Sequence, residues 1–236
     1  MQFSAIVAPT VKELFVNQIE DKILTGELEI GQRLPSEREL AETMRLSKTA
    51  VHSGIADMER KGFLRVEPRR GIFVNDYARY GTLEALESIM QHSGGQLDRR
   101  NVRSVLEMRE AIEGYCLRKV AAAPSPELLE TLQFLLSRAH QLADQGGDFY
   151  EELAEIYFTF HHAICVASQN TLAPLIMNAF HKPAVRFWRN SARTLGLRFS
   201  VGRLERFMQL IEARDVEGAC AYLKQISDTS DSIVQE

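Results

Sequence analysis

The stretch LPSERELAETMRLSKTAVHSGIADMERKGFLRV, Leu34–Val66, decides the fold of the N-terminal part of this chain. Ser36 and Glu39 are three positions apart, a spacing that predicts a capping box at the start of a helix. Ser47 predicts the N-cap of a further helix, and Gly62 predicts the end of that helix. We therefore expect two helices joined by a tight turn, the second leading straight into a strand.

The segments on either side of this stretch complete a recognisable unit. Before it, apolar residues at spacings of three to five predict a helix over residues 10–26. After it, FLRVEPRRGIFVND, residues 63–76, contains two β-rich runs around a Pro-Arg-Arg-Gly turn, which predicts a hairpin. Helix, turn, helix and hairpin in this order make a winged helix-turn-helix, whose second helix fits the major groove of B-DNA.

Charge supports a DNA partner only when it is counted locally. The whole chain carries a net charge of −4, which alone gives no reason to expect a nucleic acid. Between residues 33 and 70, however, there are nine Lys or Arg and six Asp or Glu residues, a balance of +3. Because phosphate contacts supply most of the affinity of such a module, this local excess favours DNA binding.

The first residues of the predicted recognition helix are the expected readers of base edges. These are Ser47, Lys48, Thr49 and His52, and Lys48 and His52 share a helix face because they are four apart. The hairpin tip at residues 69–71 adds two arginines and a glycine that can enter the minor groove. Any one of these residues alone is better explained as part of a solvated surface. Their ordered combination is much rarer.

The same stretch resembles the GntR family of bacterial transcription regulators. The family's pattern is matched at Leu34–Glu42, Ser47–Ser53 and Gly62–Val74. The resemblance implies operator binding by a symmetric dimer, and it gives Arg38 the place of a phosphate- and groove-contacting arginine. With Arg45 added, the predicted DNA-binding residues are Arg38, Arg45, Ser47, Lys48, Thr49, His52, Arg69, Arg70 and Gly71.

Three positions depart from the family pattern. Lys48 and His52 stand where the family usually has arginines, and Ser53 replaces a usual glutamate. Lysine cannot make the rigid bidentate fork that arginine makes to guanine. We therefore do not assume the family's usual operator.

Beyond about residue 80 the pattern changes to long helical periods. We expect about six helices with short connections, which is an α-helical bundle. The predicted fold class is mainly α, with a winged helix-turn-helix domain over residues 1–77 and an all-helical effector-binding and dimerisation domain over residues 78–236. Three widely spaced cysteines and no apolar run of 18 residues favour a cytoplasmic protein without a membrane span.

The second half resembles the effector domain of the FadR-type branch of that family. The segment EMREAIEGYCLRKVA matches through Arg109 and Glu113, and FHHAICVASQN matches around His161 and Asn170. Many members of the branch hold a metal with one Asp and three His. Here the aspartate position holds Tyr157, and the two later histidines fall near Arg206 and Ile226. Only His161 remains as a candidate ligand, so we predict neither a metal nor another cofactor.

Two kinds of effector remain open. One is an acyl or acyl-CoA ligand within the bundle, and the other is a small organic acid held without metal by Arg109 and Arg206. Arg109 is equally explained by a salt bridge to Glu113, four residues on. A metal-dependent carboxylate sensor centred on His161 is a further alternative. The predicted effector-binding residues are Arg109, Tyr157, His161, Asn170 and Arg206.

An enzyme is the less favoured class of function. A small hydrolase would use His161 or His162 with Tyr157 or Glu155, but the chain has no nucleophile elbow, no Gly-rich phosphate loop and no His-Glu-x-x-His pair. A pure interaction module would not need the basic hairpin. We predict a ligand-gated repressor or activator of metabolic genes that acts as a homodimer on double-stranded operator DNA and does not bind membranes. The segment over residues 76–81 would transmit the effector signal.

Overall fold

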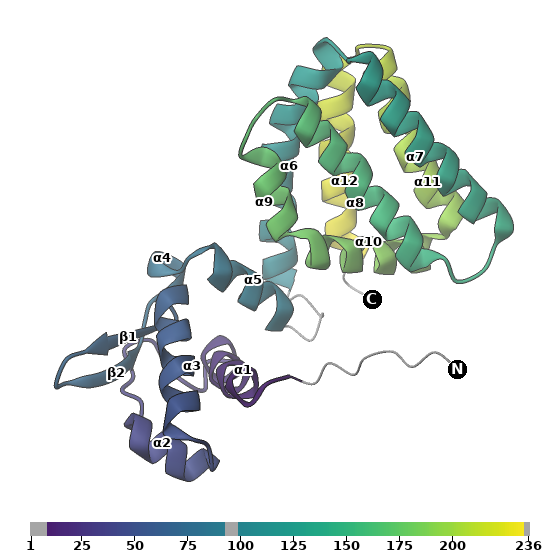
Figure 1. The fold of residues 1–236 in the computed structure, drawn as a ribbon. Coiled ribbons are helices and arrows are strands. Elements are labelled where there is room, and N and C mark those ends of the chain that lie inside the picture. The colour runs from purple at the N-terminus through teal and green to yellow at the C-terminus, as the bar shows by residue number, and fades with distance from the viewer. Residues whose placement is uncertain (1–8, 93–98, 234–236) are drawn as a thin grey trace. The chain divides into compact units, whose positions relative to one another are not determined.

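The computed structural model describes residues 9–92 and 99–233, which belong to two compact units dividing between residues 94 and 95 (Figure 1). Within the described residues, the N-terminal unit contains α1 (Val11–Leu24), α2 (Glu37–Met44), α3 (Lys48–Lys61), β1 (Leu64–Glu67), β2 (Gly71–Val74), α4 (Tyr77–Tyr80) and α5 (Leu83–His92). The structure therefore groups α4 and α5 with this unit, whereas the predicted domain boundary lies between residues 77 and 78. That boundary stays a prediction.

The helix ends in the N-terminal unit lie where the capping residues predict them. The Ser36 hydroxyl accepts a hydrogen bond from the Glu39 backbone N–H at 3.3 Å, and a Glu39 carboxylate oxygen accepts one from the Ser36 N–H at 2.8 Å. Ser47 caps α3 by accepting from the Ala50 N–H at 3.1 Å. Gly62 ends α3 with a left-handed φ of 89°, a conformation that costs glycine little. The predicted capping box, second cap and helix stop are confirmed.

The predicted hairpin is confirmed as an antiparallel pair, with Leu64 opposite Val74 and Glu67 opposite Gly71. The three-helix core beneath it depends on a close approach between α1 and α3. A Cβ atom at Gly54 of α3 would lie 2.4 Å from a ring carbon of Phe15, so only glycine fits there. Phe15, Ile55 and Met58 are fully buried in this core, and burial of such side chains is the main stabilising contribution.

The C-terminal unit is entirely helical in its described residues, as predicted. It contains α6 (Arg99–Ala122), α7 (Pro126–Gln145), α8 (Tyr150–Ala167), α9 (Ala173–Ala179), α10 (His181–Leu195), α11 (Leu197–Glu212) and α12 (Val216–Ile233). These are seven helices, not about six, because the run after residue 170 is broken at Phe180 into α9 and α10. Pro183 explains the break: it has no N–H to donate within a continuous helix but fits the first turn of a new one.

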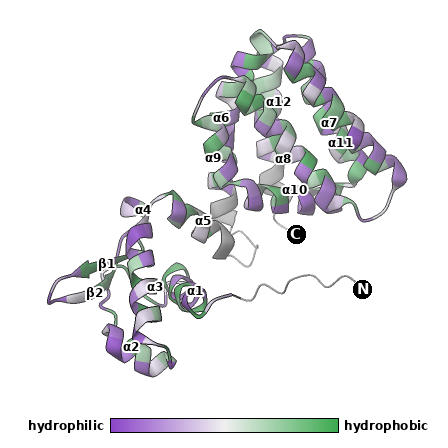
Figure 2. Cartoon of the chain, viewed as in Figure 1, coloured by the Kyte–Doolittle hydropathy of each residue, from purple (hydrophilic) through white to green (hydrophobic). Residues whose placement is uncertain are grey.

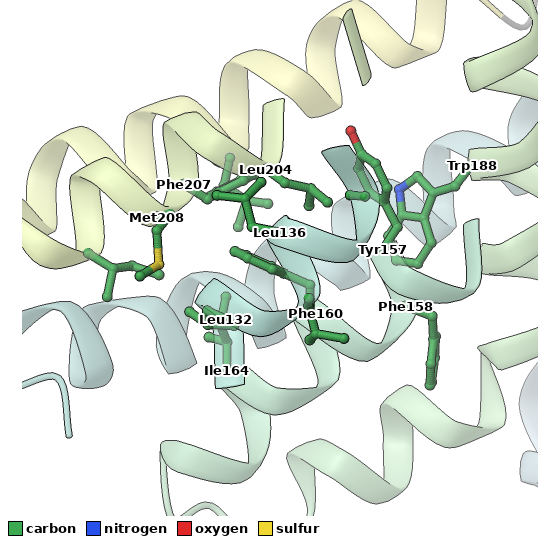
Figure 3. Packing of buried hydrophobic residues seen from close by; sticks show 14 of the residues in the cluster. Leu132, Leu136, Tyr157, Phe158, Phe160, Ile164, Trp188, Leu204, Phe207 and Met208 are labelled. Atoms are coloured by element: carbon green, nitrogen blue, oxygen red, sulfur yellow. The ribbon is translucent and has the colours of Figure 1, made fainter. Parts of the chain in front are cut away.

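The core of this unit draws buried side chains from all of its helices, among them α7, α8 and α11. Leu132, Phe160 and Leu204 come from these three helices and are fully buried (Figure 3). Hydrophobic and hydrophilic residues alternate along the same helices (Figure 2). Within residues 9–92 and 99–233, no helix is both long and apolar enough to cross a membrane.

Candidate DNA interface and effector pocket

The N-cap and the first two turns of α3 carry four of the predicted DNA-binding residues. Ser47, Lys48, Thr49 and His52 all lie at the surface. His52 has a side chain 72% exposed, and its Nδ1 lies 3.0 Å from a carboxylate oxygen of Glu37 on α2. A ligand that takes up the His52 ring must therefore compete with Glu37.

Two further predicted residues lie on or after α2. Arg38 is highly exposed and its Nε lies 3.9 Å from a Glu42 carboxylate oxygen, a loose i,i+4 pair that leaves the guanidinium accessible. Arg45 is also exposed and ends α2 with a left-handed φ of 55°. Arg45 thus lies in the turn between the two helices of the motif.

The tip of the β1–β2 hairpin, the wing, carries Arg69, Arg70 and Gly71. Arg69 adopts a left-handed φ of 65° and Gly71 a φ of 123°. The Arg70 guanidinium lies 2.8 Å from a carboxylate oxygen of Glu67 on the same hairpin. Both arginines are exposed.

Arg33 lies at the wing, although it is not among the predicted DNA-binding residues. It forms an isolated antiparallel bridge with Phe73 of β2, which brings it beside the tip. A Cβ atom at Gly71 would lie only 2.8 Å from Arg33 Nε. The local charge count includes Arg33, but its place beside the wing depends on a pairing that no local pattern predicts.

A small cavity in the C-terminal unit has a volume of ≈ 10 Å³ and so has room for about one water molecule. It draws residues from five helices. Its lining residues are Arg109, Tyr157, His161, Phe187, Trp188, Ser191, Ser200, Arg203, Phe207 and Ile226. Three of the predicted effector-binding residues, Arg109, Tyr157 and His161, are thereby brought together. We call this cavity the bundle pocket.

Arg109, Glu113 and His161 form a buried charged cluster at the bundle pocket. Arg109 Nε donates to Glu113 Oε2 at 2.9 Å, and Arg109 Nη2 lies 3.1 Å from His161 Nε2. His161 Nδ1 lies 3.3 Å from the same Glu113 oxygen. The side chain of Arg109 is 9% exposed, and those of Glu113 and His161 are 1% exposed. The alternative that Arg109 pairs with Glu113 is therefore confirmed, and Arg109 also lines the pocket.

Burial and charge set the protonation states in this cluster. Burial alone would raise the pKa of Glu113, but the Arg109 guanidinium and His161 outweigh it and hold that pKa at about 2. Burial lowers the pKa of His161, although Glu113 acts in the opposite direction. A neutral His161 fits the contacts, since Nδ1–H can donate to Glu113 while Nε2 accepts from Arg109.

Aromatic rings close the pocket around this cluster. The Trp188 ring stacks on His161 with centroids 5.3 Å apart and an interplanar angle of 15°. The Arg109 Cζ lies 5.1 Å from the centroid of the same Trp188 ring. Tyr157 lies next to Trp188 (Figure 3), and its hydroxyl donates to the Ser200 backbone carbonyl. Burial raises the pKa of Tyr157, so its hydroxyl stays protonated.

Two polar atoms of the cluster have unused hydrogen-bonding capacity. Among the described residues, Arg109 Nη1 and Glu113 Oε1 are buried and have no hydrogen-bond partner. Leaving such groups unpaired costs about 1–3 kcal/mol each, and more when they are charged. Arg109 lines the pocket, so its free N–H groups suit an oxygen acceptor placed there.

Two predicted effector-binding residues lie outside the pocket lining. The Asn170 side-chain oxygen accepts from the N–H groups of Leu172 and Ala173 at 3.0 and 3.1 Å, which fixes the turn before α9. Arg206 is exposed, and its guanidinium lies 3.4 Å from the Gln209 side-chain oxygen. Arg203, one turn earlier on α11, lines the pocket in its place. The spacing of three between the two arginines could have suggested this shift in register.

The residues at the pocket do not fit a metal ion. Across the part of the chain that the structure describes, no group of three or more His, Cys, Asp or Glu residues is close enough to hold one. The four positions expected to align with metal ligands hold Tyr157 and His161 and fall near Arg206 and Ile226. The guanidinium of Arg109 also lies beside His161 and would repel a cation.

Both units match known families in sequence. Residues 12–74 match the family described as bacterial regulatory proteins, gntR family, and residues 104–228 match the FCD domain. The chain is 33% identical over 133 residues to the HTH-type transcriptional regulator Mce2R of Mycobacterium tuberculosis (strain CDC 1551 / Oshkosh), a match that covers 56% of this chain and 55% of that protein. It is 29% identical over 176 residues to the fatty acid metabolism regulator protein of Shewanella sp. (strain MR-4), covering 72% of this chain and 68% of the relative.

The chain spans about half of the length of the mycobacterial relative, since the match covers 55% of that protein.

The fold itself has a counterpart among solved structures. The structure described as "Lar controls the expression of the Listeria monocytogenes agr system and mediates virulence" superposes with a TM-score of 0.65 and 15% identity, covering 97% of this chain and 98% of the other. At this identity the likeness shows a common fold alone.

Proposed function

Because the chain belongs to the GntR family of bacterial regulators and carries its FCD domain, we propose that it is a ligand-responsive transcriptional regulator that binds operator DNA as a homodimer. The observation that carries the proposal is the exposed start of α3 next to an arginine-bearing wing. Two copies would present their α3 helices to successive major grooves about 34 Å apart. Such a regulator acts where the chromosome is, which is why we predict a cytoplasmic protein.

Lys48 and His52 are the proposed base readers. Lys48 offers a single flexible ammonium group, so it can accept several geometries at guanine or phosphate but does not impose the bidentate one. His52 must leave Glu37 to reach a base. Arg38, Arg45, Arg69 and Arg70 would supply phosphate and groove contacts, and Arg33 extends this set at the wing.

We propose a small organic acid as the effector. The support is the buried Arg109, whose Nη1 has no partner among the described residues, together with Arg203 in the same pocket lining. A carboxylate would give both guanidinium groups an acceptor. Because the pocket volume is ≈ 10 Å³, such a ligand must displace a side chain. Trp188 is the proposed side chain, since it lines the pocket and its ring stacks on His161.

An acyl or acyl-CoA ligand remains the second candidate, favoured by the similarity to a protein named fatty acid metabolism regulator. The small pocket volume is against it, since an acyl chain would have to open a path through the packed helices. A hydrolase finds little support. The Tyr157 hydroxyl already donates to Ser200, and its raised pKa makes it a poor nucleophile.

The segment over residues 76–81 is the proposed transmitter, because it is packed against the end of α3. The Thr82 N–H donates to the Lys61 carbonyl at 3.0 Å. A Cβ atom at Gly62 would lie 2.5 Å from the Tyr80 carbonyl oxygen, so the two backbones touch. A shift of α4 would therefore push directly on the C-terminal end of the recognition helix.

The DNA-binding proposal is tested by anisotropy of a labelled mixed-sequence duplex titrated with the protein at 50 and 200 mM salt. A protein with six to ten phosphate contacts should lose roughly 10³- to 10⁵-fold in affinity between these concentrations. Weak binding without a salt trend would contradict the proposal. Selecting bound duplexes from a random pool would then identify the operator.

The effector proposal is tested by thermal melting with a panel of short mono-, di- and tricarboxylates and, in parallel, with acyl-CoA. Stabilisation by one carboxylate that is lost in the Arg203→Met variant would support a small acid at the bundle pocket. Stabilisation by acyl-CoA alone would instead identify an acyl-CoA as the effector. Arg206→Met, an exposed arginine on the same helix, is the matched control.

A further inference from the structure

The two outer edges of the wing are held in different ways. The wing is a sheet of two strands, so each strand has one edge that faces away from its partner. On the β2 edge the contact is made by main chain, since the Val74 N–H donates to the Gln32 carbonyl at 2.9 Å. On the β1 edge it is made by a side chain of the recognition helix: the Val66 N–H donates to Glu59 Oε1 at 2.9 Å.

The bond from Glu59 lies where the hydrophobic core does not hold β1. Leu64 is buried at the start of β1 and lies opposite Val74, which is also buried. Further along the hairpin, Val66 lies opposite Ile72, and here only the β2 residue belongs to the core: Ile72 is 6% exposed and Val66 is 41% exposed. Beyond this pair the chain runs to the arginines of the tip. The Glu59 bond therefore holds the outer part of β1 against α3.

Glu59 is well placed to hold the wing because the last turn of α3 is itself fixed. Lys61 Nζ donates to Glu20 Oε1 of α1 and to Ser88 Oγ of α5, both at 2.9 Å. The Lys61 side chain is 16% exposed and that of Glu20 is 6% exposed. Glu59 thus offers a charged acceptor on a rigid element, and hydrogen bonds to charged acceptors are stronger than those between neutral groups.

We propose that Glu59 is a positioning residue for DNA binding: by accepting the Val66 N–H it fixes the orientation of the wing relative to α3. The tip arginines and the start of α3 can then reach one duplex together. This inference rests on the DNA binding proposed above and adds to it a residue that does not touch DNA itself. A carboxylate is repelled by phosphate, so any gain in affinity from Glu59 must come from the wing that it holds.

Two substitutions separate the hydrogen bond from the charge. Glu59→Gln and Glu59→Met both remove the charge and keep a long unbranched side chain with good helix propensity, but only glutamine keeps an oxygen acceptor. Anisotropy with a labelled mixed-sequence duplex should show Glu59→Met of the full chain binding roughly two- to tenfold more weakly than Glu59→Gln, the range for one net hydrogen bond. Circular dichroism checks that both variants keep their helices.

The salt dependence of binding shows whether the effect passes through the wing. The slope of log affinity against log salt should be smaller for Glu59→Met by about 0.9 for each tip arginine that no longer reaches a phosphate, and so by up to about 1.8 for two. A purely structural role would reduce the fraction of active protein and leave the slope unchanged. Glu27→Met, which alters an exposed acid in the loop after α1, is the control and should keep the wild-type slope.

A double-mutant cycle gives a second check. In an Arg69→Ala/Arg70→Ala background the tip has no charge left to position. The difference in affinity between Glu59→Met and Glu59→Gln should then shrink to less than about twofold, because coupled residues lose their effect when the partner is removed. A difference as large as in the otherwise wild-type chain would overturn the inference.

The outcomes separate this inference from the proposed function. Weaker binding and a smaller slope for Glu59→Met than for Glu59→Gln support it. A wild type that binds DNA with a steep salt dependence, together with equal affinities or equal slopes of the two variants, overturns the role of Glu59 and leaves DNA binding standing. A wild type without salt-dependent DNA binding overturns both.

Discussion

At the scale of single residues, the buried cluster of Arg109, Glu113 and His161 is the most informative feature. A buried ion pair is weak evidence for stability, because desolvation cancels much of the attraction between the charges. Here the arginine also leaves Nη1 without a partner among the described residues. A buried cluster that lowers stability in this way and lines a pocket supports the effector site proposed above.

Removing the acid from this cluster should destabilise the protein strongly. Glu113→Gln leaves the Arg109 charge buried without its counter-ion, and we expect a loss of about 3–5 kcal/mol in the free energy of unfolding. Glu107→Gln, which breaks the exposed pair with Arg103 on the same helix, should cost about 0–1 kcal/mol. Urea unfolding of the two variants measures the difference, and equal losses would contradict the role given to burial.

The same cluster predicts a loss of stability in acid. His161 has a folded-state pKa below its ordinary value of 6.5, so the unfolded chain binds a proton that the folded chain does not. The contribution of neutral His161 to the free energy of unfolding is therefore present at pH 7 and falls as the pH drops below 6.5. Glu113, held at about 2 against an ordinary 4.5, adds a further loss between pH 4.5 and 2.

Melting temperatures at pH 7.5, 5.5 and 4.5 check this prediction. His161→Asn should flatten the decline between pH 7.5 and 5.5, whereas His140→Asn, which alters a half-exposed side chain on α7, should leave it unchanged. An identical decline in His161→Asn and wild type would show that other groups cause it.

At the start of α3, Lys48→Ala should weaken operator binding by about 1–3 kcal/mol and relax selection at one base pair, if Lys48 contacts a base edge. If it contacts only phosphate, affinity should fall equally for every sequence. Lys224→Ala, an exposed lysine of α12, is the control and should bind like wild type. Anisotropy with operator and mutated duplexes distinguishes these results.

At the scale of elements, the wing depends on a backbone that only glycine adopts easily. Gly71 has a φ of 123°, and a Cβ atom there would meet Arg33 Nε at 2.8 Å. Gly71→Ala should therefore displace Arg33 and lower DNA affinity severalfold, in addition to a backbone cost of about 1 kcal/mol.

Gly31→Ala is the matched control for the wing. Its φ of 84° imposes a similar backbone cost, but nothing lies within 4 Å of the added Cβ atom. Urea unfolding should therefore show comparable losses for the two variants, while only Gly71→Ala should weaken binding in the anisotropy titration. Equal DNA affinities of the two variants would show that Arg33 does not contact DNA.

At the scale of the whole molecule, the proposed function requires that effector and operator affect each other. If saturating effector changes operator affinity by a factor of about 5–150, operator must change effector affinity by the same factor, because the coupling free energy is shared. Calorimetric titration of the effector with and without operator duplex measures this reciprocity. An effector that binds tightly but leaves operator affinity unchanged would be a ligand without a regulatory role.

Local patterns in the sequence determined most of the fold. Ser36, Ser47 and Gly62 predicted helix ends correctly because capping depends on residues within one turn of each other. The missed break at Phe180 shows the limit of this reasoning. Helical periodicity continues across α9 and α10, and only the position of Pro183 marks the separation.

What the sequence by itself determined about this protein is its class: a winged helix-turn-helix followed by a helical bundle, with exposed basic residues at the start of α3. Only the tertiary structure decided the composition of the bundle pocket, where Arg203 takes the place expected for Arg206 and Trp188 stacks on His161. It also brought Arg33 to the wing. The physical reason is that caps and periodicities act between near neighbours in the chain, whereas a pocket is made by side chains from helices far apart in sequence, whose rotations are set by packing.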